Sequence, residues 1–227
     1  MAEEQKKSII TAPNNTLHLP RQLSEAEEKY TKFILEQIKN LNDNKIPRNH
    51  KGDEEVNLTF TIEEYDLLNN LLDSLIVNKT FKGSLIIKST KFDDKLGFKI
   101  SKIIEKDNLT YIKIDNQTKP FSDKIGIKIG DALKSNNNLK SLNIFLNIGE
   151  YSPDHLVQFL VNENSSLENI SFLKLNKKFF ESFANYMTKE SKLKKIGFYF
   201  EPLEFHDLLY GKEILYNYNY YYIILIC

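Results

Sequence analysis

Apolar residues in this chain recur in short clusters, and the clusters return at a nearly constant interval. In six segments, 56–60, 83–87, 109–114, 139–144, 167–172 and 193–198, every second position is typically apolar. This alternation is typical of a short strand with one buried face. The central apolar residues of the segments lie 26 to 30 positions apart: Leu58, Leu85, Ile112, Leu142, Ile170 and Ile196. Such a period predicts one structural unit repeated six times.

Between these segments, apolar residues are spaced four apart, as on one face of a helix. The clearest examples are Phe92, Leu96, Ile100 and Ile104, and then Phe121, Ile125, Ile129 and Leu133. One strand and one helix cannot bury their apolar faces alone, whereas stacked units can share a continuous core. We therefore expect an α/β fold with a parallel sheet on one side and helices on the other.

The chain before the repeats has a different pattern. Residues 1–23 are polar and contain two prolines, which predicts a mobile polar arm. Ser24 and Glu27 have the spacing of a capping box, in which each side chain accepts a hydrogen bond from a backbone N–H at the start of a helix. An apolar stripe follows up to Leu41. Residues 24–54 are thus predicted to form an N-terminal capping helix and a linker.

The stretch 125–144, IGIKIGDALKSNNNLKSLNI, resembles the ribonuclease-inhibitor-like subclass of leucine-rich repeats. The matching positions are Gly126, Ala132, Leu133, Asn136 and Leu139. The resemblance implies a solenoid bent into a horseshoe arc, with parallel strands on the concave side, helices on the convex side, and six repeats over 55–202. The subclass usually has Asn or Cys shortly after each strand, and in this chain only Asn147 stands at such a position. The subclass includes enzyme inhibitors, GTPase activators, innate sensors, actin regulators and pathogen effectors, so the resemblance predicts the fold more than the function.

Residues between the buried strand positions should face the concave surface in three columns. The third column ends with Phe145, Leu173 and Tyr199, three large side chains that would form an exposed apolar patch. The predicted partner-binding residues are Tyr111, Lys113, Phe145, Leu173, Lys195 and Tyr199. Two alternatives stay open: the C-terminal segment of the chain covers this patch, or the strand phase is wrong near the end.

Residues 203–227 do not continue the repeat, and they end in the β-prone sequence NYNYYYIILIC. They are predicted to be an irregular C-terminal tail. Three interpretations remain: the segment pairs as a final strand, it contacts lipid or a partner, or it is truncated or mispredicted. We favour the last, because a solenoid normally ends in a polar cap.

Charge and chemistry narrow the classes of function. Lys and Arg together number 31, as do Asp and Glu, so the formal net charge is zero, which argues against nucleic-acid binding. No apolar run is long enough for a signal peptide or a membrane span, and Cys227 is the only cysteine. We expect a cytoplasmic protein. The four histidines are scattered, and no nucleotide, hydrolase or zinc motif occurs, so the sequence suggests no catalytic residue, metal, cofactor or small-molecule substrate.

These observations favour a non-enzymatic scaffold that binds a protein partner on its concave face. One alternative is a GTPase activator of the leucine-rich-repeat type. The only arginines are Arg21 and Arg48, so the repeats themselves supply no arginine finger. Another alternative is a substrate adaptor for a ubiquitin ligase.

Overall fold

The computed structural model describes residues 23–47, 57–116, 121–144, 146, 166–171, 194–200, 215–217 and 220–226. In the last two segments and most of 195–200, only the backbone is described. The elements, in chain order, are α1 (Glu25–Asn42), β1 (Asn57–Thr61), α2 (Tyr65–Val77), β2 (Gly83–Lys88), α3 (Asp94–Glu105), β3 (Leu109–Asp115), α4 (Asp123–Ser135), β4 (Ser141–Ile144), β5 (Asn169–Ser171), β6 (Lys195–Phe200), β7 (Leu215–Asn217) and β8 (Tyr220–Ile226).

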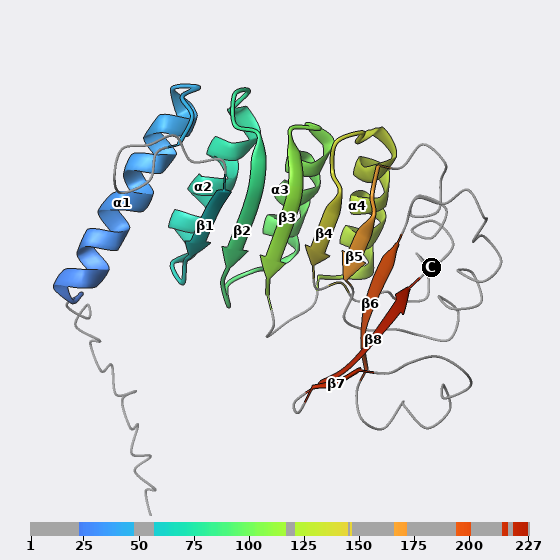
Figure 1. Cartoon of the computed structure of the whole chain (residues 1–227). Coiled ribbons are helices and arrows are strands. Elements are labelled where there is room, and N and C mark those ends of the chain that lie inside the picture. Colours follow the sequence, from blue (N-terminus) through green and yellow to red (C-terminus); the bar gives the residue numbers. More distant parts are fainter. Residues whose placement is uncertain are drawn as a thin grey trace, which may run out of the picture.

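The strands form one sheet in the order β1-β2-β3-β4-β5-β6-β8-β7. The pairings from β1 to β6 are all parallel, and each joins strands that are consecutive in the chain. Helices α2, α3 and α4 lie on one face of this sheet, and α1 lies beside α2 at its first end (Figure 1). The predicted α/β architecture, with consecutive parallel strands, is therefore confirmed for the described elements.

The register of the sheet also matches the sequence pattern. The six residues that the repeat period placed at the centre of each strand are Cα partners in one continuous row: Leu58, Leu85, Ile112, Leu142, Ile170 and Ile196. A slip of one residue in any strand would turn its apolar side chains to the opposite face. The strand phase predicted from the sequence is thus correct from β1 to β6.

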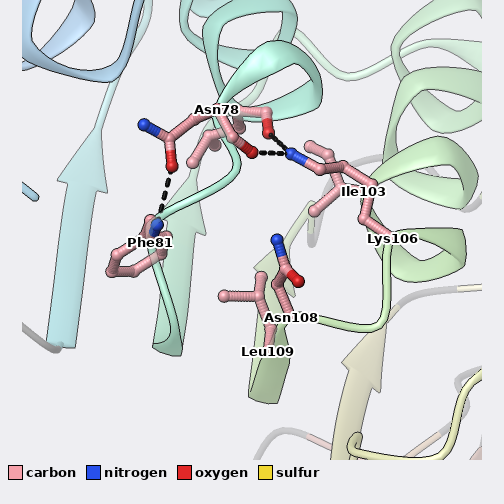
Figure 2. A pocket seen from close by; sticks show the side chains of 7 residues that line it. Asn78, Phe81, Ile103, Lys106, Asn108 and Leu109 are labelled. Atoms are coloured by element: carbon pink, nitrogen blue, oxygen red, sulfur yellow. Dashed lines mark hydrogen bonds between the residues drawn. The ribbon is translucent and has the colours of Figure 1, made fainter. Parts of the chain in front are cut away.

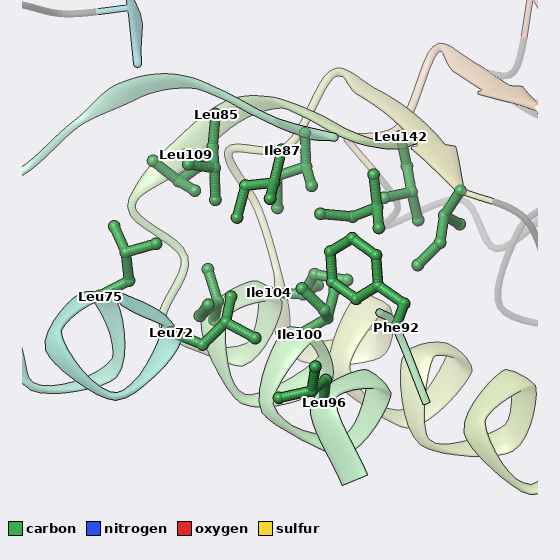
Figure 3. Packing of buried hydrophobic residues seen from close by; sticks show 14 of the residues in the cluster. Leu72, Leu75, Leu85, Ile87, Phe92, Leu96, Ile100, Ile104, Leu109 and Leu142 are labelled. Carbon is green, nitrogen blue, oxygen red and sulfur yellow. The ribbon is translucent and has the colours of Figure 1, made fainter. Parts of the chain in front are cut away.

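The core lies between the sheet and the helix layer. Inward residues of β2 and β3 meet the four-spaced residues of α3, as Figure 3 shows for Leu85, Ile87 and Ile100. Both predicted helical stripes are fully buried, from Phe92 to Ile104 and from Phe121 to Leu133. Apolar groups of this size contribute about 1.5–3 kcal/mol each when they leave water, so these shared contacts dominate the stability of the stack.

At the first end, α1 closes the core. Its predicted capping box forms: the Ser24 N–H donates to Glu27 Oε2 at 2.8 Å, and the Glu27 N–H donates to Ser24 Oγ at 3.3 Å. Tyr30 reaches β1, where its hydroxyl accepts a hydrogen bond from the Thr61 N–H at 2.9 Å. Ile34 and Leu41 are buried. Helix α1 therefore covers the first end of the core and also satisfies a backbone donor of the first strand.

At the other end, β8 pairs antiparallel with β6, and β7 pairs antiparallel with β8. For these residues the pairing agrees with one of the three interpretations of the C-terminal segment, that of a final strand. The physical reason is that β6 would otherwise leave a row of backbone groups unpaired, and the β-prone tail can satisfy them. Residues 1–22 of the expected arm and 48–54 of the linker lie outside the described residues.

Candidate functional site

The face of the sheet opposite the helices is the candidate interaction surface, and we call it the open face. Its residues alternate with the buried ones and align across the strands in the predicted columns. The first column is Asn57, Ser84, Tyr111, Ser141, Asn169 and Lys195, and the second is Thr59, Ile86, Lys113, Asn143, Ser171 and Gly197. From β1 to β5 these residues are exposed or half-buried. The open face is mostly polar over the described strands.

Two of the six predicted binding residues can be placed completely. Tyr111 and Lys113 lie on β3, are half-buried, and belong to neighbouring columns. Lys195 and Tyr199 lie on β6, where their backbones pair with Ile226 and Tyr222 of β8.

The other two, Phe145 and Leu173, lie outside the described residues. Tyr111 and Lys195 stand in the same column of the sheet. A single site formed by all six side chains stays a prediction. The apolar patch of Phe145, Leu173 and Tyr199 stays a prediction.

Charges on the open face are unevenly matched. Lys88 on β2 is exposed, and neither it nor Lys113 forms an ion pair with any residue that the structure describes. Where β4 to β6 begin, Glu168 lies 3.8 Å from Lys140 and 2.7 Å from Lys194. The hydrogen bond from Lys194, helped by its positive charge, lowers the pKa of the Glu168 carboxyl. One carboxylate thus partly balances two lysines in the row at the start of these strands.

The helices end at the same edge of the sheet where the strands begin, and we call this the amino edge. At the end of α2, the buried Asn78 donates from Nδ2 to the Leu41 carbonyl of α1 at 2.8 Å. Its Oδ1 accepts hydrogen bonds from the N–H groups of Thr80 and Phe81, at 3.0 and 2.7 Å. One amide therefore joins the end of α1 to the turn that leads into β2.

Asn136 does the same at the end of α4. Its Nδ2 donates to the Ile104 carbonyl of α3 at 2.6 Å, and its Oδ1 accepts from the N–H groups of Asn138 and Leu139 at 3.0 and 2.7 Å. Asn136 is as inaccessible as a core residue, with 4% of its surface exposed. Because a buried amide without partners is costly, these three bonds fix the turn into β4.

Helices α1 and α3, which Asn78 and Asn136 contact, are each followed by a residue in a different backbone conformation. Asn44 follows α1 and Asp107 follows α3, and both adopt the left-handed backbone conformation, with φ of 56° and 60°. Asn and Asp tolerate this conformation better than other non-glycine residues do. Asn44 Oδ1 accepts a hydrogen bond from the Lys79 N–H, and Asp107 Oδ1 accepts from the N–H groups of Asn137 and Asn138. The junctions α1/α2 and α3/α4 are therefore joined from both sides.

The α2/α3 junction has a lysine in place of asparagine. Lys106 donates from Nζ to the Leu75 carbonyl at 2.7 Å and to the Asn78 carbonyl (Figure 2). Burial, and secondarily the charge of Lys79, lowers the pKa of Lys106. Beside it, a cavity of about 10 Å³ is lined by Leu75, Asn78, Phe81, Ile103, Lys106, Asn108 and Leu109. A space of this size holds one water molecule.

Sequence reasoning missed this edge, although a signal is present. Asn78, Lys106 and Asn136 each stand three residues before the apolar residue that opens the next strand segment, namely Phe81, Leu109 and Leu139. Their spacing follows the repeat period. A polar residue that recurs at the end of each predicted helix, in phase with the strands, could have been recognised as a bridge between repeats.

No group of three or more His, Cys, Asp or Glu side chains that could bind a metal ion occurs in the described part of the chain. Over the same residues, no helix is long and apolar enough to cross a membrane.

No known family model matches the sequence, and no curated protein is significantly similar to it. Solved structures do share its fold. The actin-binding site 2 domain of leiomodin-1 is 16% identical, with a TM-score of 0.50, over 68% of this chain and 87% of that one. The C-terminal domain of tropomodulin from Caenorhabditis elegans is 7% identical, with a TM-score of 0.51, over 69% of this chain and 92% of that one. At such identities the likeness concerns the fold, a parallel-sheet α/β arrangement similar to leucine-rich repeats.

Proposed function

We propose that this chain is a non-enzymatic scaffold, a leucine-rich-repeat solenoid of the ribonuclease-inhibitor-like kind, that binds a protein partner on its open face. One observation carries the proposal: five consecutive strands present aligned, exposed or half-buried side chains on the face opposite the helices. A broad face of parallel strands offers many contact positions on a rigid frame, as interfaces between proteins require. The partner would contact Tyr111 and Lys113 in the centre, and Phe145, Leu173, Lys195 and Tyr199 towards the last strands.

Site-specific photo-crosslinking tests the proposal. A benzophenone amino acid is placed at Ile86 or at Asn143 on the open face, and at Phe98 on the exposed side of α3 as the matched control. After irradiation in native extract, we expect the same protein to be attached from both open-face positions and not from the control. Attachment from Phe98 alone, or from all three positions equally, would contradict the proposal.

Actin is a second candidate partner, because the leiomodin-1 domain with this fold is an actin-binding site. Co-sedimentation with filaments and native gel electrophoresis with monomers test it directly. Binding that disappears when Tyr111 and Lys113 are both replaced by alanine would identify actin as the ligand of the open face. Binding that survives these changes would place actin elsewhere.

The two other candidates are distinguished by activity and by composition. A GTPase activator would raise nucleotide hydrolysis by a small GTPase in a panel assay, by means of a residue other than arginine. A ubiquitin-ligase adaptor would co-precipitate with a ligase scaffold. Neither result is expected if the chain acts as a simple scaffold.

A further inference from the structure

The α2/α3 junction gathers positive charge on the amino edge of the sheet. Lys79 and Lys82 directly follow Asn78 and Phe81, two residues that line the small cavity of this junction. Both lysines are exposed, and their ammonium groups bond to no residue that the structure describes. Lys106 forms part of the cavity wall, and its pKa is lowered in part by the charge of Lys79. Three lysines therefore belong to this junction, and two of them, Lys79 and Lys106, are near enough for their charges to interact.

The described residues supply no acid to balance them. No carboxylate lines the cavity. Two other lysines on the surface do have acidic partners: Lys45 pairs with Asp43 at 3.1 Å, and Lys102 pairs with Glu105 at 2.9 Å. The Asp107 carboxylate accepts hydrogen bonds from backbone groups of the next turn instead. The positive charge at α2/α3 is thus open to an outside ligand.

The cavity also contains an unused hydrogen-bond donor. Asn108 is half-buried and lies beside Lys106 in the cavity (Figure 2). Its amide has no hydrogen-bond partner among the described residues. The cavity volume of about 10 Å³ accommodates one oxygen atom. The amide of Asn108 and the ammonium group of Lys106, both at a space of this size, match a carboxylate oxygen.

We propose that the amino edge at the α2/α3 junction docks an acidic segment of a partner protein, with one carboxylate oxygen at Asn108 and further carboxylates at Lys79 and Lys82. A nucleic acid fits less well, because its phosphates favour long basic stripes and bidentate arginine, whereas the described residues contain no arginine. An anionic membrane typically requires a cluster of more lysines than the three gathered here. This surface lies at the edge of the sheet, so the proposal does not depend on what binds the open face.

The test measures binding of a fluorescein-labelled oligoglutamate peptide by fluorescence anisotropy. The variant Lys79→Glu/Lys82→Glu is compared with Lys95→Glu/Lys124→Glu, which makes the same charge change at exposed, unpaired lysines in the first turns of α3 and α4. We expect affinity to fall about tenfold or more in the first variant and less than about twofold in the second, since attraction between charges acts over about a Debye length. Higher salt should weaken wild-type binding.

A neutral substitution makes the test independent of total charge. Asn108→Leu removes the amide and leaves every charge in place, and we expect about threefold weaker binding with an unchanged circular dichroism spectrum. Equal weakening by the two charge variants would overturn the proposal. So would tighter binding of labelled oligothymidine or of phosphatidylserine vesicles with the same dependence on Lys79 and Lys82, because either result would assign the surface to a different class of ligand.

Discussion

The junctions within this stack are of two kinds. At α1/α2 and α3/α4, a buried asparagine at the end of the second helix donates to the last turn of the first, and a left-handed Asn or Asp after the first helix accepts a hydrogen bond in return. At α2/α3, Lys106 donates to two carbonyls, and it can accept no bond. We call the first kind of junction reciprocal, because a side chain at each helix end takes part, one as donor and the other as acceptor. In the second kind, both hydrogen bonds come from the side chain of Lys106.

This difference indicates that the repeats are organised in pairs. Asn78 and Asn136 are equivalent residues two repeats apart, and so are Asn44 and Asp107. The α1/α2 and α3/α4 junctions are closed by hydrogen bonds that involve side chains from both helix ends. The α2/α3 junction contains a charged lysine, a water-sized cavity and an amide without a hydrogen-bond partner among the described residues. The weaker junction is also the one with the unbalanced lysines. The hydrogen bonds that join the helices and the proposed docking of an acidic segment therefore lie at different junctions of the same edge.

The comparison is tested most strongly by removing an asparagine. Asn136→Ala deletes three hydrogen bonds and leaves the Leu139 N–H without an acceptor, while the Asn138 N–H keeps only Asp107. We therefore expect the free energy of unfolding to fall by about 3 kcal/mol. Asn78→Ala should cost a similar amount, and Lys106→Met about 1 kcal/mol. Urea denaturation followed by circular dichroism measures all three. Equal losses for the three variants would show that the junctions do not differ.

Asp107 tests the other half of the reciprocal junction. Asp107→Ala removes the acceptor of the Asn137 N–H and one of two acceptors of the Asn138 N–H, and it places alanine in the left-handed conformation. We expect a loss of about 2 kcal/mol in the free energy of unfolding. Asp107→Gly relieves the backbone strain but not the lost bonds, so it should cost about 1 kcal/mol. If the glycine variant were as stable as the natural chain, the bonds to Asn137 and Asn138 would contribute nothing.

The strands could be predicted from the sequence because a period of two within a strand and a period near 28 between strands both act on apolar residues. The same rules correctly placed Tyr111 beside Ser141, and Lys113 beside Asn143, across the sheet. The junctions could not be predicted in this way. Asn78, Lys106 and Asn136 resemble ordinary surface residues at helix ends, and the near-complete burial of the two asparagines depends on the neighbouring repeat. Whether Phe145, Leu173 and Tyr199 form a patch depends on residues of 203–227, which do not follow the repeat.

Close packing of α3 on α4 gives a smaller effect. A Cβ atom at Gly97 would lie 2.7 Å from Phe121 Cδ1 and 2.9 Å from Ile125 Cγ2, two buried side chains with little room to move. Gly97→Ala gains helix propensity but overpacks this contact, so we expect a net loss of about 1 kcal/mol in the free energy of unfolding. Lys102→Ala, at an exposed position of the same helix, is the control and should change stability by less than about 0.5 kcal/mol. A stabilised Gly97→Ala variant would show that the helices can separate at no cost.

The smallest expected effect is a pH dependence confined to the α2/α3 junction. Because burial lowers the pKa of Lys106 in the folded chain, the folded state binds fewer protons than the unfolded state between that lowered pKa and the ordinary value of 10.5. Stability therefore rises with pH in this window, as the cost of burying the charge is removed. The gain should be on the order of a few tenths of a kcal/mol, since water still reaches part of the side chain. It is measured as the difference between the natural chain and Lys106→Met in urea denaturation at several pH values, which cancels the other lysines and tyrosines. If the difference in unfolding free energy stayed constant with pH, or changed in the opposite direction, burial would not destabilise the charged form of Lys106. The lysine would then not weaken the α2/α3 junction.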